Sequence, residues 1–276
     1  QVWEEGTAKE IWSSIGGLWR GVNSTEDLSP KSVMEVLRLG TYIATQFKPI
    51  VAKVVYNMTD AKTVLDTSMG WGDRLTAFYA SNAIHYIGCD PNPNTFARYK
   101  KMQEFFDKLT GGKKTVQMYN CGAEDLPYNE LPDIDCAFTS PPYFSTEQYN
   151  KGGEYEEDQS WSKFNEYEKW RDSFFLPVAE KTLSKSKYMF VNIMDPKIKN
   201  KRYRSSDELV DSFKDKFLGQ IGMRIMQRPQ GTKKFKTKEE LNIFMAMTYI
   251  ENIWCFGEKI DLFKTSRLGT LEDCME

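Results

Sequence analysis

Short apolar runs alternate with longer amphipathic segments between about residues 61 and 195, and this alternation restricts the fold more than any other feature of the chain. The runs read TVLDTS, YIGCD, TVQMYN, IDCAF and KYMFVNI. Strands that alternate with helices form a mostly parallel sheet, so we expect an α/β fold. Two later apolar runs, MRIMQR and ENIWCFG, predict a terminal antiparallel hairpin.

The 276 residues suffice for one α/β domain with additions. Residues 1–60 look helical, with Pro30 placed to open a helix after the candidate cap Ser29. We expect an N-terminal helical extension over 1–60 and the sheet-containing domain over 61–276, with 195–240 as a short basic insertion. Three tryptophans of the extension either cover the sheet or form an interface: Trp3, Trp12 and Trp19.

Composition excludes several classes of protein. The 37 basic and 39 acidic residues give a net charge of −2, so the overall charge does not indicate nucleic acid. The five cysteines are scattered and His85 is the only histidine, so we expect neither a metal site nor disulfides. Without an apolar run of about 20 residues or a start that resembles a signal peptide, we expect a soluble intracellular protein, in the cytoplasm or nucleus, with no membrane partner.

Three candidate ligand-binding features follow the first three predicted strands. The glycines of Asp66–Gly72, DTSMGWG, allow a tight turn and close approach of a ligand, although the third glycine of a dinucleotide motif is missing. Asp90 ends the second strand and either accepts the hydroxyls of a ribose or caps the next helix. Glu124 and Asp125 follow the third strand, where they either accept an adenine amino group or lie in a solvated loop.

The fourth strand leads into Thr139–Phe144, which reads TSPPYF. Prolines commonly end a strand, but a plain turn does not explain the two aromatic residues. Two stiff carbonyl groups beside a hydroxyl and a flat ring suit a planar ligand that carries an amino group. All four features are expected at the carboxyl ends of the strands, where open α/β sheets bind ligands.

This ordered set resembles the S-adenosylmethionine-dependent DNA amino-methyltransferases, which methylate N6 of adenine or N4 of cytosine. The resemblance spans about residues 45–195 and rests chiefly on DTSMGWG and SPPY. It implies a Rossmann-like class I methyltransferase fold, with a mostly parallel seven-stranded sheet that ends in an antiparallel hairpin. It also implies S-adenosyl-L-methionine as cofactor and DNA as partner.

The resemblance implies a role for each motif residue at the cofactor. Asp66 would lie near the methionine amino group, Asp90 would hold the ribose, and Asp125 or Glu124 would contact the adenine. Phe47 and Pro49 are similar to an FxP motif that packs against the cofactor, or they mark a helix break with a buried ring. The expected cofactor-binding residues are Phe47, Pro49, Asp66, Ser68, Gly70, Gly72, Asp90, Glu124 and Asp125.

The catalytic motif would comprise Ser140, Pro141, Pro142 and Tyr143. The Ser140 side chain and the Pro141 carbonyl can accept both hydrogens of an exocyclic amine and direct its lone pair at the methyl group. The base must be flipped out of a duplex, and the ring of Tyr143 or Phe144 would stack on it. The Pro-Cys motif of covalent cytosine C5 methylation is absent.

Serine at the first motif position is similar to the cytosine-N4 branch, since many adenine enzymes of the family have Asp or Asn there. We therefore expect N4 of cytosine as target, with N6 of adenine next. Two basic clusters either contact phosphates or form a solvated surface. The expected substrate-binding residues are Phe144, Lys197, Lys199, Lys201, Arg202, Arg204, Arg228, Lys233 and Lys234.

Other functions stay open at this point. The same cofactor could serve RNA or a glutamine side chain, although those amide enzymes favour Asn at the first motif position. A non-catalytic nucleic-acid-binding subunit would lack an intact glycine loop, and a nicotinamide oxidoreductase does not fit the glycine pattern. Only about 45 residues, 195–240, are available for target recognition, so specificity is either short, lax or supplied by a partner chain, with a partner subunit or a homo-oligomer as candidates. The acidic stretch 154–158 is either a lid or a partner surface.

Overall fold

The computed structural model describes residues 46–146, 148–198, 200–225, 237–240 and 249–259. The chain divides into two compact units, and the unit described below comprises residues 46–224 and the segment from residue 250 onward. Several predicted features lie outside the described residues. They are the extension up to residue 45 with its three tryptophans, and the basic residues Lys199, Arg228, Lys233 and Lys234.

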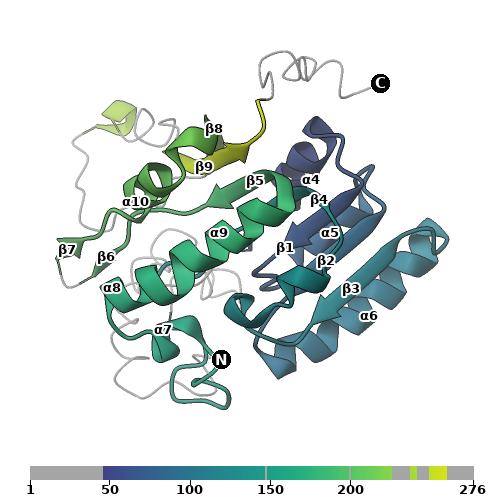
Figure 1. The fold of residues 1–276 in the computed structure, drawn as a ribbon, viewed down its shortest axis with the longest axis horizontal. Helices are drawn as coiled ribbons and strands as arrows, with labels where there is room; N and C mark the ends of the chain where they lie inside the picture. Colours follow the sequence, from purple (N-terminus) through teal and green to yellow (C-terminus); the bar gives the residue numbers. More distant parts are fainter. Residues whose placement is uncertain (1–45, 147, 199, 226–236, 241–248, 260–276) are drawn as a thin grey trace. The chain divides into compact units, whose positions relative to one another are not determined.

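A seven-stranded sheet forms the centre of this unit, in the order β3-β2-β1-β4-β5-β9-β8 (Figure 1). Five of its strands are parallel, whereas β9 runs antiparallel to β5. This arrangement confirms the predicted α/β sheet with its terminal antiparallel pair. The strands are β1 Thr63–Asp66, β2 His85–Cys89, β3 Thr115–Tyr119, β4 Ile134–Thr139, β5 Ser186–Asn192, β8 Phe217–Ile225 and β9 Tyr249–Gly257.

The strand order reverses direction between β1 and β4, which makes their carboxyl ends the switch point of the sheet. Right-handed crossovers that lead in opposite directions place their helices on opposite faces. Accordingly, α9 covers one face of the sheet and α5 and α6 cover the other (Figure 1). The principal helices are α4 Pro49–Met58, α5 Asp73–Tyr79, α6 Pro93–Thr110, α9 Leu176–Lys185 and α10 Ser205–Ser212.

Local sequence sets the bounds of α6, the longest of the described helices. The Asn92 side chain accepts a hydrogen bond from the Asn94 N–H at 2.9 Å and caps the first turn, and Pro93 occupies the first helical position. Gly111 ends the helix with φ of 74°, a left-handed conformation that favours glycine. The predicted helix is confirmed, and its cap is Asn92 rather than Asp90.

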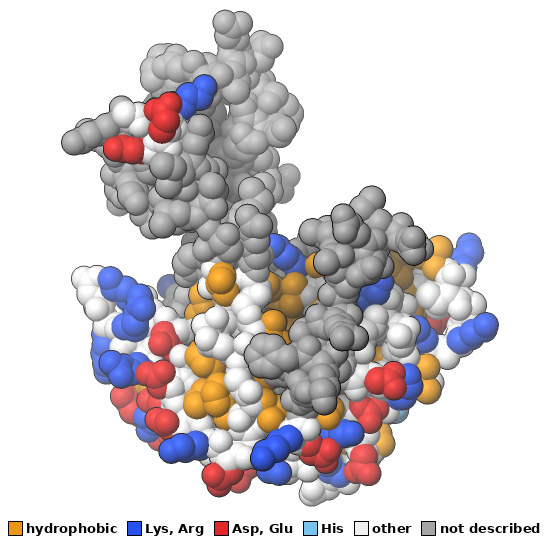
Figure 2. Space-filling model, turned by 90° about the horizontal axis from the view of Figure 1, so that it is seen from above, with side chains coloured by type: hydrophobic (Ala, Val, Ile, Leu, Met, Phe, Trp, Pro, Cys, Tyr) orange, Lys and Arg blue, Asp and Glu red, His pale blue; other side chains and the backbone are white. Residues whose placement is uncertain are grey.

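The chain between β4 and β5 contains three short helical pieces: α7 Ser160–Lys163, α8 Tyr167–Trp170 and a π-helical turn at Arg171–Phe175. A two-stranded ribbon then follows β5, with β6 at Lys197–Ile198 and β7 at Lys201–Arg202. No helix among the described residues is long and apolar enough to cross a membrane. On the face drawn in Figure 2, apolar side chains gather toward the middle, and side chains of both charges mix around the margin.

Candidate active site

The glycine loop after β1 turns back over the carboxyl end of β2. The Met69 N–H donates to the Cys89 carbonyl at 3.0 Å, which ties the loop to the neighbouring strand. Gly70 and Gly72 have φ of 55° and 81°, where a side chain is strained. A Cβ on Gly72 would lie 2.7 Å from Met102 Cε. Among the described residues, a Cβ on Gly70 would meet nothing closer than the Ser68 carbonyl oxygen at 3.9 Å, so this part of the chain leaves space beside the glycine.

Asp66 lies below the loop and is fully buried. Its carboxylate accepts hydrogen bonds from Arg74 Nε at 3.0 Å, from the Tyr86 hydroxyl at 2.8 Å and from the Ser68 N–H at 3.1 Å. Burial alone would lower the pKa of Arg74, but the charge and hydrogen bond of Asp66 outweigh burial and raise it. A contact of Asp66 with the methionine amino group stays a prediction, and in the fold Oδ2 accepts from Arg74 and Tyr86 while Oδ1 accepts from the Ser68 N–H.

Asp90 joins the end of β2 to the glycine loop. One carboxylate oxygen accepts from the Gly70 N–H at 3.0 Å and the other from the Asn92 N–H at 3.0 Å. Burial raises the pKa of Asp90 to about 6, although these two N–H groups oppose the shift. The Tyr99 hydroxyl is a further hydrogen-bond partner of this carboxylate, which still keeps lone-pair capacity for a ligand.

Glu124 and Asp125 lie in the short helical turn after β3, Ala123–Asp125. Lys163 Nζ of α7 lies 2.9 Å from Glu124 Oε1 and 3.8 Å from Asp125 Oδ2. The chain beyond the SPPY motif therefore returns to the loop after β3. Lys163 was not predicted, and nothing in the sequence around it marks this contact.

Phe47 and Pro49 lie at the start of α4. Pro49 opens the helix, and the Phe47 ring packs edge-on against Phe138 of β4, with centroids 5.5 Å apart. The Arg74 guanidinium lies 5.3 Å from the centre of the Phe47 ring. Phe47 thus packs against the same buried arginine that is hydrogen-bonded to Asp66. In the structure, Phe47 and Pro49 form the start of a helix with a packed ring.

The SPPY motif begins directly after β4, at the switch point. Thr67 and Thr139, the residues that follow Asp66 and precede Ser140, are joined by a hydrogen bond of 3.0 Å between their hydroxyls. Pro141 is buried, whereas Ser140 is half-buried. The hydrogen bond holds together the starting points of the glycine loop and the SPPY motif, which the sequence separates by about seventy residues.

The Tyr143 hydroxyl lies where β4, β5 and β9 meet. It donates toward Glu251 Oε1 at 2.9 Å and lies 3.2 Å from the Asn192 carbonyl and 3.3 Å from Asn192 Oδ1. The Ser140 hydroxyl lies 3.4 Å away. Asn192 and Glu251 were not predicted, because their contact depends on the pairing of β5 with β9, which brings together residues far apart in the chain.

Phe144 is buried in the core, with 5% of its surface exposed. Its ring packs 5.6 Å from Tyr167, 5.9 Å from Trp170 and 5.9 Å from Tyr203. The expectation that Phe144 stacks on a substrate base is therefore wrong for this arrangement. Its φ of 49° is unusual for a bulky residue, and the packed ring holds the chain in this sharp bend after Tyr143.

Four of the predicted basic residues lie on or beside the β6–β7 ribbon at the edge of Figure 1. They are exposed, and Lys201 Nζ lies 4.5 Å from the centre of the Tyr203 ring. Arg204 forms an exposed ion pair with Asp207 at 3.6 Å. The ribbon and the residues next to it thus carry four exposed cations, close to the aromatic residues that pack around Phe144. They are Lys197, Lys201, Arg202 and Arg204.

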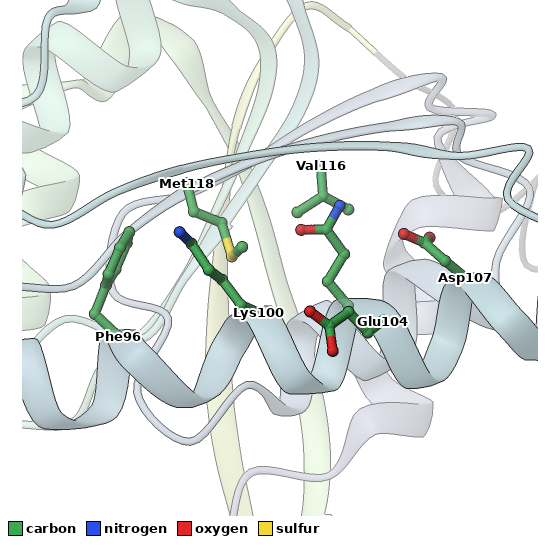
Figure 3. A pocket seen from close by; sticks show the side chains of 7 residues that line it. Phe96, Lys100, Glu104, Asp107, Val116 and Met118 are labelled. Atoms are coloured by element: carbon green, nitrogen blue, oxygen red, sulfur yellow. The ribbon is translucent and has the colours of Figure 1, made fainter.

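An open groove lies apart from this site, between α6 and the edge strand β3 (Figure 3). Phe96 and Lys100 extend from the helix toward the strand, where Met118 lies. None of the residues that line it was predicted as a site residue. Among the described residues, no group of three or more His, Cys, Asp or Glu side chains is placed to hold a metal ion.

The sheet order and the loops at its switch point define a Rossmann-like methyltransferase fold. Within this class, residues 134–259 match the model of the N6/N4 DNA methylase family. The match covers SPPY and the strands from β4 to β9, but not the glycine loop, and it confirms the resemblance to the DNA amino-methyltransferases. The sheet order and the matched segment both agree with the predicted methyltransferase fold.

Several solved structures are similar to the chain at low identity. The N-terminal domain of EvdMO1 with SAH bound is 8% identical, with 78% of this chain and 82% of that chain covered and a TM-score of 0.45. An rRNA methylase from Streptococcus thermophilus is 12% identical, with 78% and 100% covered and a TM-score of 0.43. A SAM-dependent O-methyltransferase from Thermotoga maritima is 11% identical, with 82% and 71% covered and a TM-score of 0.42. No curated protein matches the chain.

Proposed function

We propose that the protein transfers a methyl group from S-adenosyl-L-methionine to the exocyclic amine of a base flipped out of DNA, with N4 of cytosine ahead of N6 of adenine. The observation that carries the proposal is the SPPY motif at the switch point, joined through Thr139 and Thr67 to the start of the glycine loop. The match to the N6/N4 DNA methylases supports DNA as the substrate.

The glycine loop and its neighbours fit the cofactor. The described residues leave space beside Gly70, so a ligand can approach the main chain closely there. Asp90 borders this space through its bond to the Gly70 N–H and can accept ribose hydroxyls. Glu124 or Asp125 would accept the adenine amino group, and Lys163 holds both carboxylates at the loop after β3. The cofactor supplies a methyl group on a sulfonium, which needs a positioned nucleophile.

The SPPY residues would position the target amine. An exocyclic amine is a poor nucleophile because its lone pair is delocalised into the ring. The Ser140 hydroxyl and the Pro141 carbonyl would accept its two hydrogens, so that the lone pair points along the line of attack. Tyr143, whose hydroxyl is fixed by β5 and β9, would stack its ring on the flipped base. The cations of the β6–β7 ribbon would contact phosphates.

Transfer of a labelled methyl group tests the proposal. Purified protein is incubated with labelled S-adenosylmethionine and, in separate arms, unmethylated DNA, RNA and a glutamine-containing peptide. We expect label in DNA, a loss of at least about 100-fold in Ser140→Ala, and no change in Ser184→Ala, which removes an exposed hydroxyl on α9. Label in RNA or peptide alone would overturn the choice of substrate.

Binding of S-adenosylhomocysteine distinguishes the residues that contact the cofactor from those that contact the target base. Asp90→Ala should weaken binding by about 10-fold to 100-fold, the effect of losing a hydrogen bond to a charged group. Ser140→Ala should bind it normally. Equal loss of binding in both variants would contradict the division into a cofactor half and a base half. An absence of binding by the unaltered protein would favour a non-catalytic subunit.

A further inference from the structure

The hydrogen bonds around Tyr143 have a fixed direction. Its hydroxyl has one hydrogen, and three neighbouring atoms of Asn192 and Glu251 can only accept it. The nearest of them is Glu251 Oε1, at 2.9 Å. The Asn192 amide nitrogen donates to the Asn252 carbonyl at 3.0 Å, so the amide oxygen is the atom that faces Tyr143. The phenol hydrogen is therefore committed to this acceptor side.

The direction of the Tyr143 hydrogen bond determines which hydroxyl donates in the contact between Ser140 and Tyr143. Its hydroxyl lies 3.4 Å from the Tyr143 hydroxyl, and either atom could donate by distance alone. Because the Tyr143 hydrogen is used elsewhere, Ser140 is the donor in this pair and Tyr143 is the acceptor. Both lone pairs of the Ser140 oxygen are then free to accept hydrogens from a substrate amine. If the Ser140 hydrogen instead pointed at the amine, it would face the amine hydrogens, and the hydroxyl could not accept them.

We propose that Glu251 supplies the carboxylate of the methyl-transfer site, acting through Tyr143 and Ser140 as a positioning residue and terminal proton acceptor. This inference rests on the proposed function and assigns a role to a residue on β9, far in sequence from the SPPY motif. The half-buried position of Glu251 suits both tasks, since the carboxylate reaches Tyr143 and also keeps contact with solvent.

The proton path balances the reaction. The amine nitrogen forms a bond to the methyl carbon, and the bond from that carbon to sulfur breaks with its electron pair left on sulfur. The nitrogen then carries the positive charge and gives a proton to the Ser140 oxygen. The Ser140 proton passes to Tyr143 and the Tyr143 proton to Glu251. The products are a neutral methylated amine and a protonated Glu251, which releases its proton to water.

Steady-state kinetics of Glu251→Gln tests the inference. Gln has nearly the same shape but carries no charge, and its amide can also donate, so it neither fixes the direction of the chain nor accepts the proton. We expect kcat to fall by about 100-fold, the lower end of the range for a positioned acid or base. KM for DNA and the affinity for S-adenosylhomocysteine should stay within about twofold. The matched control is Glu258→Gln, an exposed glutamate directly after β9, which should keep the unaltered kcat.

A double variant distinguishes this role from simple packing. Tyr143→Phe keeps the ring and removes the hydroxyl, and it should lower kcat to a similar extent. If the residues act as one chain, Tyr143→Phe with Glu251→Gln should be no slower than either variant alone. Losses that multiply, or a Glu251→Gln variant with normal kcat, would overturn the inference while leaving the proposed function intact. An unaltered protein that methylates no base would overturn the proposed function itself, and this role with it.

Discussion

Replacing Asp66 by Asn should destabilise the fold by about 3–5 kcal/mol, the cost of breaking one side of a buried ion pair. The Arg74 side chain is 5% exposed and that of Asp66 is 0% exposed. Asn keeps an oxygen for the Ser68 N–H but removes the charge that faces Arg74. The guanidinium would stay buried without a counter-charge, and the Tyr86 hydroxyl would lose a charged acceptor.

A Coulomb estimate agrees with that range. At the 3.0 Å separation of Arg74 Nε and Asp66 Oδ2, an effective dielectric constant of about 20 gives about 5.5 kcal/mol, close to the upper end of that range. Native domains have a free energy of unfolding of about 5–15 kcal/mol, so the variant should keep a reduced but measurable free energy of unfolding at low temperature.

Urea unfolding followed by tryptophan fluorescence measures the effect, since the chain has seven tryptophans. The control is the double variant Asp66→Leu with Arg74→Met, which removes both charges and should recover most of the loss. An Asp66→Asn protein that unfolds at the unaltered urea concentration, yet no longer binds S-adenosylhomocysteine, would refute the reasoning. It would mean that this carboxylate contacts the cofactor after all.

Three further predictions concern the glycine loop, its neighbour Asp90 and the residue that follows the SPPY motif. Burial raises the pKa of Asp90 to about 6, and Asp90 must be ionised to accept ribose hydroxyls. The affinity for S-adenosylhomocysteine, measured by calorimetry, should therefore fall about 10-fold from pH 7 to pH 5. In Asp90→Asn the affinity should not change with pH over this range, and a change would contradict the contact of Asp90 with the ribose. Gly72→Ala should cost about 1–3 kcal/mol in urea unfolding, since φ is 81° and the new Cβ meets Met102. Phe144→Ala should cost about 3–5 kcal/mol in thermal unfolding; a loss below about 1 kcal/mol would mean that the ring is not packed.

The elements that position the site were largely predictable from local sequence. The predicted runs TVLDTS, YIGCD and IDCAF coincide with β1, β2 and β4 within a few residues, because alternating strands and helices allow few arrangements. Pro49 was predicted as one mark of a helix break, and in the structure it opens α4.

The orientation of side chains was not predictable. Asp66 points into the fold because Arg74, the second residue of α5, is buried with it. An arginine in a helix gives no sign of burial in the sequence. Phe144 turns inward because Tyr167, Trp170 and Tyr203 form a pocket for it. These contacts depend on tertiary packing, which local patterns do not encode.

The Tyr143 network shows the same limit over a longer distance. Glu251 lies 108 residues from Tyr143, and only the antiparallel pairing of β9 with β5 brings it there. Lys163 reaches Glu124 through a segment without periodicity. Residues that support a catalytic motif from other strands thus become visible only when the sheet order is known.

The central claim is that an exocyclic amine of a DNA base receives the methyl group, and nucleoside mass spectrometry tests it most directly. Unmethylated DNA is incubated with the protein and isotopically labelled S-adenosylmethionine, then digested to nucleosides, beside Ser140→Ala. The account predicts label in N4-methylcytosine, or else in N6-methyladenine, which vanishes in the variant. Label in C5-methylcytosine, or in no nucleoside despite measurable binding of S-adenosylhomocysteine, would contradict it.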